Sequence, residues 1–153
     1  MKILRESLAA LGVLLMLGMV AMHYSSLPAM IPVHFNGRGV ADGWGGKGEL
    51  WVLIGVAAFI YAVMTVANFY PEYMVSMPVK VARRPAALPM AVEMLGWVKF
   101  EITWMFLWLC RSMIAVAQGT RTGLGTWTMP VMLCAMLGTV VFYYWRILRS
   151  PAV

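Results

Sequence analysis

The residues best suited to chemistry lie in one polar segment, residues 27–47, between two long apolar stretches. The segment contains His34, Asn36, Asp42 and Lys47. An imidazole can bind a metal ion or transfer a proton near neutral pH, and a neighbouring carboxylate can orient it or act as a second ligand. A reaction or a recognition site is therefore expected in this segment.

Three chemical interpretations of the segment stay open. His34, Asp42 and Glu49 could bind a metal ion, although no HxxH or HExxH spacing supports this. His34 could act in acid–base chemistry with Asp42 orienting its ring, although no nucleophile accompanies the pair. Lys47 could close a phosphate-binding glycine loop, but the Walker pattern fails because Gly48 stands where Ser or Thr is required.

A fourth interpretation, which we favour, makes the polar groups structural, with or without a recognition surface. Irregular backbone near a membrane must find internal hydrogen-bond partners. We therefore expect His34 and Asn36 to satisfy backbone groups and Lys47 to pair with Asp42. Asn36 and the glycine after it are a strong turn signal. Trp44 is expected to anchor the segment at the membrane interface.

The composition indicates what must position these residues. Of the 153 residues, 62% are hydrophobic and 12% are charged, against roughly 45–50% and roughly 25% in soluble domains. The pattern predicts an all-α integral membrane protein with a single domain, residues 1–153. The net charge of +6 does not indicate nucleic-acid binding, because the basic residues flank apolar spans instead of forming one stripe. Cys110 and Cys134 fall inside apolar spans and lack zinc-type spacing, so they are interpreted as small apolar residues.

Four transmembrane helices are predicted, and the segment between the first two is expected to be an irregular Pro/Gly-rich loop. The first helix is expected to be an uncleaved anchor because its apolar stretch is long. Prolines and paired basic residues predict a loop over 72–89, with an extended stretch around 77–81. The spans lie at about residues 4–24, 50–69, 92–117 and 127–145.

Basic residues in the loops predict the orientation. With both termini inside, seven Lys and Arg residues lie on the inner side and three on the outer side. The termini are therefore expected in the cytoplasm, with residues 27–47 outside. The inner residues are Lys2, Arg5, Lys80, Arg83, Arg84, Arg146 and Arg149, and the outer ones are Arg38, Lys47 and Arg121.

The third span is unusual because it carries charges, which are costly inside a membrane. At helical spacing one polar and aromatic stripe is expected to face the bundle or a partner. Lys99 points to the other side, and both Glu93 and Lys99 are expected to reach water at the inner boundary. Arg111 is expected to meet Asp42 or Glu49, and Glu101 a basic loop residue. The stripe comprises Glu93, Trp97, Glu101, Trp104, Trp108 and Arg111.

The polar segment also carries a family resemblance. Its pattern Leu-Pro-x-x-Ile-Pro-x-His-Phe-Asn-x-x-Gly-x-x-Asp-x-Trp-Gly-x-Lys resembles the signature of a bacterial multi-pass membrane domain of unknown function. That domain also forms the N-terminal part of SdpI-like bacteriocin immunity proteins, whose second, C-terminal module has no counterpart here. The resemblance implies these signature residues: Pro28, Pro32, His34, Asn36, Gly39, Asp42 and Lys47.

Together these features predict a non-enzymatic protein of the bacterial inner membrane, accessory, immunity-like or sensing, without a cofactor. It would recognise a peptide or a partner membrane protein through residues 27–47 and the third helix. A homo-oligomer or a subunit of a larger membrane complex is expected, because four spans make a thin bundle. The alternative is a small transporter or a metal-dependent membrane enzyme using His34, Asp42, Glu49, Glu101 and Arg111.

Overall fold

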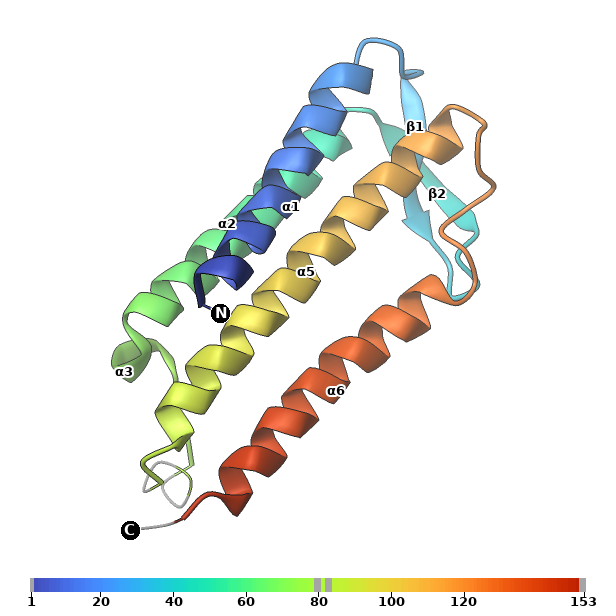
Figure 1. The fold of residues 1–153 in the computed structure, drawn as a ribbon. Helices are drawn as coiled ribbons and strands as arrows, with labels where there is room; N and C mark the ends of the chain where they lie inside the picture. The colour runs from blue at the N-terminus through green and yellow to red at the C-terminus, as the bar shows by residue number, and fades with distance from the viewer. Residues whose placement is uncertain (1, 79–80, 82–83, 152–153) are drawn as a thin grey trace.

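Four long helices and one small hairpin make up the fold (Figure 1). The computed structural model describes residues 2–78, 81 and 84–151. Helices α1, α2, α5 and α6 are long and apolar enough to cross a membrane, which confirms four predicted spans and indicates a membrane protein. The elements are α1 (Lys2–His23), β1 (Met30–Phe35), β2 (Ala41–Gly46), α2 (Glu49–Phe69), α3 (Pro71–Met74), α5 (Ala87–Ala117) and α6 (Thr128–Arg149).

Several helix boundaries differ from the prediction: α1 begins at Lys2 and α6 ends at Arg149, against predicted limits of 4 and 145. Helix α5 begins at Ala87, not at residue 92, because Pro89 lies in the first helical turn, where a missing N–H costs nothing. Helix α3 occupies the start of the segment predicted as a loop, with a proline at its first position. Residues 79–80 and 82–83 of the predicted loop lie outside the described residues.

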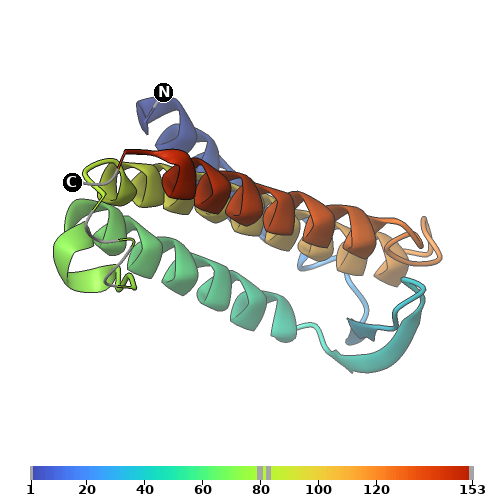
Figure 2. The same cartoon turned by 90° about the horizontal axis from the view of Figure 1, so that it is seen from below.

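Helix α5 is the centre of the bundle and packs against α1, α2 and α6 (Figures 1 and 2). Gly12 permits the close approach of α1, since a Cβ there would lie 3.4 Å from the Cβ of Thr103. The apolar core lies between α1, α2 and α5 and extends under the hairpin. Its members include Met16, Val20, Ile31, Leu50, Ile54, Cys110 and Met113.

The segment predicted as irregular is largely a two-stranded antiparallel sheet, which corrects the expectation. Strand β1 pairs with β2 from Met30↔Gly46 to Phe35↔Ala41, and the register shifts on both sides of His34. Proline and repeated glycine argue against an interior strand, but each strand here is an edge, where they are tolerated. The hairpin lies at the opposite end of the bundle from the start of α1 and the end of α6 (Figure 1).

Candidate functional site

The hairpin turn is built by Asn36. Its Oδ1 accepts hydrogen bonds from the backbone N–H groups of Arg38, at 2.9 Å, and Val40, at 3.1 Å. Gly39 completes the turn with a φ of 75°, a conformation that disfavours a side chain. The turn predicted at Asn36 and its role in satisfying backbone groups are confirmed.

His34 and Asp42 form a pair across the hairpin. The Nδ1 of His34 lies 2.5 Å from the Oδ1 of Asp42. This is the arrangement expected for a carboxylate that orients an imidazole, and it replaces the expected bond from His34 to the backbone. Both side chains are largely exposed, His34 at 71% and Asp42 at 43%.

Lys47 does not pair with Asp42, contrary to the expectation. Its Nζ donates to the carbonyl oxygens of Tyr24, at 3.1 Å, and Leu27, at 3.4 Å. It also lies 4.8 Å from the centre of the Tyr24 ring, a cation–π contact. The two carbonyls follow the end of α1, where a cation is favoured by the helix dipole. Lys47 therefore ties the exit of the hairpin to the end of α1.

The other signature residues divide between packing and surface. Pro32 is fully buried, whereas Pro28 is exposed. Trp44 pairs with Pro32 in the ladder, and its side chain is 55% exposed. Gly39 touches the backbone of Gly125 so closely that an added Cβ would lie 2.7 Å from its carbonyl oxygen.

The hairpin is attached to the loop between α5 and α6. The N–H of Leu124 donates to the carbonyl of Gly39 at 2.8 Å, and Val40 forms a β-bridge with Gly123. These contacts join the hairpin tip to the loop that carries Arg121. We call the combined surface the hairpin platform: residues 30–46, residues 118–127, Trp108 and Arg111.

Two arginines of the platform share one aromatic ring. The guanidinium carbon of Arg111 lies 5.3 Å from the centre of the Trp108 ring, and that of Arg121 lies 5.1 Å from it. Both residues are exposed. Within the described part of the chain neither forms an ion pair, so the expected bond from Arg111 to Asp42 or Glu49 is wrong.

Part of the polar stripe of α5 faces neighbouring helices, as expected, but Arg111 is exposed. The side chain of Glu93, which was expected to reach water, is 34% exposed. Glu93 pairs with Arg5 of α1 at 3.0 Å, and the Trp104 Nε1 donates to the carbonyl of Leu8 at 3.1 Å.

Within the described residues Glu101 forms no ion pair with a basic residue, contrary to the expectation, and Lys80 and Arg83 of the predicted loop lie outside them. The Oε1 of Glu101 accepts a 2.6 Å hydrogen bond from the hydroxyl of Thr139 on α6.

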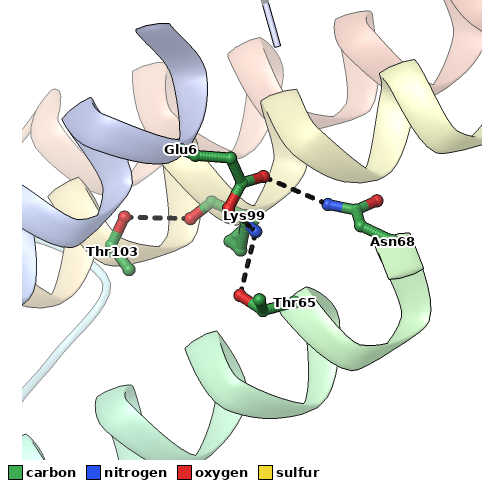
Figure 3. A network of polar contacts seen from close by, with 5 residues as sticks. All are labelled: Glu6, Thr65, Asn68, Lys99 and Thr103. Atoms are coloured by element: carbon green, nitrogen blue, oxygen red, sulfur yellow. Dashed lines mark hydrogen bonds and ion pairs between the residues drawn. The ribbon is translucent and has the colours of Figure 1, made fainter. Parts of the chain in front are cut away.

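A second polar cluster lies inside the bundle (Figure 3). Lys99 is fully buried and does not reach water at a membrane boundary, contrary to the expectation. Its Nζ lies 2.5 Å from the Oε2 of Glu6 and 3.0 Å from the hydroxyl of Thr65. The second oxygen of Glu6 accepts a hydrogen bond from the side-chain amide of Asn68 at 3.4 Å. An ammonium at this depth requires its carboxylate, since an unpaired buried charge costs several kcal/mol.

Sequence reasoning missed Glu6, Thr65 and Asn68 as functional candidates. Glu6 could have been recognised as a candidate from the sequence, because it is a carboxylate near the start of an otherwise apolar span. Lys99 was singled out, but its partner was not. The distance between these residues along the chain explains the omission, since spacing within one helix does not report which helix lies opposite.

Of the five residues of the transporter or enzyme alternative, His34 and Asp42 lie together. Within the described residues no group of three or more His, Cys, Asp or Glu side chains could hold a metal ion, so His34, Asp42 and Glu49 do not form a metal site. Cys110 and Cys134 are both free, the first buried and the second exposed.

Comparison with known proteins gives one family match. Residues 11–58 are similar to a domain of unknown function (DUF1648). The match covers α1 from Leu11 onward, the hairpin and the first half of α2, and so includes the whole polar segment at 27–47. No curated protein and no solved structure matches the chain.

Proposed function

We propose that the protein is a non-enzymatic membrane protein, of an accessory, immunity-like or sensing kind, that recognises an acidic, extended segment of a peptide or partner membrane protein. The hairpin platform is the binding surface. The observation that carries the proposal is the pair Arg111 and Arg121, two exposed cations on one indole ring without an acidic partner in the described structure.

The paired arginines favour a carboxylate ligand. Two like charges held against one ring repel each other, and a carboxylate between them would remove that repulsion while accepting charge-assisted hydrogen bonds. Arg38, exposed at the hairpin tip, adds a third cation without an ion pair among the described residues. The charge of the platform therefore supports an acidic partner over a basic or apolar one.

The hairpin favours an extended segment. Among the described residues β2 is hydrogen-bonded along one edge only, to β1. Strand β1 lies against α5, whereas the exposed positions of β2 alternate along its length. An unpaired edge can add a further strand from a peptide, with side chains read at every second position. Trp44 is exposed on β2 and would contact such a strand.

We also propose a cellular location and an orientation for the protein. The protein would lie in the inner membrane of a bacterium, with both termini in the cytoplasm and the platform outside. Support comes from the excess of loop Lys and Arg residues near the termini. The start of α1 and the end of α6 lie at the same end of the bundle, which agrees with that arrangement (Figure 1).

We further propose that a second copy or another membrane subunit packs on α6. Within the described structure α6 packs mainly on α5, and only Tyr143 and Ile147 of its residues are buried. Single-molecule photobleaching of labelled protein in native-membrane nanodiscs should show more than one copy or a second subunit. Single-copy particles without another protein would refute this part.

The test uses purified protein in nanodiscs of uncharged lipid. A fluorescent ten-residue peptide alternating Asp and Val is compared with its Asn–Val counterpart by anisotropy. The Asp peptide should bind, and Arg111→Gln with Arg121→Gln should weaken binding at least about tenfold, as expected for one lost hydrogen bond to a charged group.

The matched control removes two cations at the other end of the bundle, Arg146→Gln with Arg149→Gln, which also lie over aromatic rings. It should leave peptide affinity unchanged. Equal binding of the Asn peptide, or equal weakening in the control, would show that the platform does not recognise acidic segments.

A further inference from the structure

A charged cavity lies at the end of the bundle opposite the hairpin. It has a volume of about 320 Å³ and is formed between α1, α2 and the first turns of α5. Lys2 and Arg5 contribute two positive charges, and Glu6 and Glu93 contribute two negative ones. Lys99, whose Nζ lies 2.5 Å from the Oε2 of Glu6, adds a third positive charge beside the cavity, so the charges of Lys2, Arg5 and Lys99 against those of Glu6 and Glu93 sum to +1. Both signs are present in the walls, which suits a group that carries a phosphate and an ammonium.

Two buried polar atoms in the walls have no partner. Arg5 is 7% exposed and Asn68 is 6% exposed. The Arg5 Nη1 donates to Glu93 and the Asn68 Nδ2 donates to Glu6, but the Arg5 Nε and the Asn68 Oδ1 have no hydrogen-bond partner among the residues that the structure describes. Leaving a buried donor or acceptor unsatisfied costs about 1–3 kcal/mol. One donor and one acceptor thus remain for a bound group.

We propose that this cavity binds a phosphoethanolamine group, supplied by the headgroup of a phosphatidylethanolamine lipid. The phosphate would lie toward Lys2 and Arg5, and the primary ammonium toward Glu93 and the Oδ1 of Asn68. Helix α2 ends at Phe69 and α5 begins at Ala87. The cavity therefore lies where two spanning helices end, which is the depth of lipid headgroups.

The unpartnered atoms select among headgroups. The Oδ1 of Asn68 can only accept a hydrogen bond, so its ligand must carry an N–H or O–H. A primary ammonium has N–H groups and a quaternary choline has none. A phosphatidylglycerol headgroup has O–H groups for the Asn68 Oδ1 but no positive charge to place beside Glu93. Ethanolamine therefore fits better than choline or an anionic lipid.

Gly96 keeps room for the arginine. A Cβ at position 96 would lie 3.2 Å from the Arg5 Nε. Gly96→Ala would therefore move the guanidinium without changing any charge of the cavity. This variant separates the position of Arg5 from the number of charges.

The experiment measures lipid binding to delipidated protein by native mass spectrometry. Phosphatidylethanolamine, phosphatidylcholine and phosphatidylglycerol with identical acyl chains are titrated separately. Phosphatidylethanolamine should bind about tenfold more tightly than phosphatidylcholine, the effect of one hydrogen bond to a charged group. Asn68→Leu should abolish that preference. Equal affinity for the three lipids, or an unchanged preference in Asn68→Leu, would overturn the proposal.

A second variant, a control variant and a competition experiment complete the test. If Asn68→Leu fails to fold, Lys2→Gln is used, because Lys2 is exposed and its loss should weaken phosphatidylethanolamine binding several-fold. Arg146→Gln, which removes a cation from the same end of the bundle, should have no effect. Soluble phosphoethanolamine should compete with the lipid and phosphocholine should not. Binding of soluble phosphoethanolamine without binding of the lipid would refute the lipid as its source.

Discussion

Replacing Glu6 by glutamine should lower the free energy of unfolding by about 3–5 kcal/mol, the cost of breaking a buried ion pair from one side. Lys99 is fully buried, and Glu6, at 2.5 Å, is the one carboxylate paired with it in the described structure. Thr65 accepts a hydrogen bond at 3.0 Å but carries no charge. Glutamine keeps the size of the side chain and leaves the ammonium without a counterion, which is the source of the cost.

Removing the cation should cost less. In Lys99→Met the carboxylate of Glu6 remains 27% exposed and keeps the hydrogen bond from Asn68. We expect Lys99→Met to lower the free energy of unfolding by about 1–3 kcal/mol. The double variant removes both charges, so its destabilisation should fall short of the sum of the single effects by about 2–3 kcal/mol.

The assay is reversible unfolding by sodium dodecyl sulfate in mixed micelles, followed by circular dichroism. Glu72→Gln is the matched control, because Glu72 is exposed on α3, and it should change stability by less than about 0.5 kcal/mol. Two results would refute the reasoning: a Glu6→Gln effect as small as the control, or single effects that add up to the double.

Other predictions concern the hairpin, the cysteines and α6. Gly39→Ala should lower the stability of the hairpin by about 1–2 kcal/mol, because the φ of Gly39 is 75°. Gly37→Ala should leave it unchanged, because there is open space around Gly37. Hydrogen exchange of the backbone amides at the hairpin tip measures both effects. In folded protein in detergent, N-ethylmaleimide, which enters micelles, should modify Cys134 on the outer face of α6 faster than the buried Cys110, as followed by mass spectrometry; equal rates would contradict the burial of Cys110. Thr139→Val removes the hydroxyl that donates to the α5 carboxylate and should destabilise the protein by about 1–3 kcal/mol in the same micelle assay; no change would show that this bond is not formed.

The four spanning helices follow from the sequence because their signal is local. A run of about 20 apolar residues is long enough to cross a bilayer, and its backbone hydrogen bonds are satisfied within the helix itself. The Asn36 turn is local for the same reason, since its side chain bonds N–H groups two and four residues later. The polar stripe of α5 could also be predicted from the sequence, because helical periodicity alone sets which residues share a face.

What each face meets was decided only by the tertiary structure. The partner of Lys99 lies 93 residues away on α1, and the partner of Glu101 lies 38 residues away on α6. Spacing along one helix gives no information on such pairs, because they depend on how whole helices rotate and pack. The same holds for Lys47, which bonds carbonyls at the end of α1 and not the nearby Asp42. Local pattern determined the four long helices and the Asn36 turn of this protein. Tertiary structure determined the pairing of the two hairpin strands and which of its few charges meet.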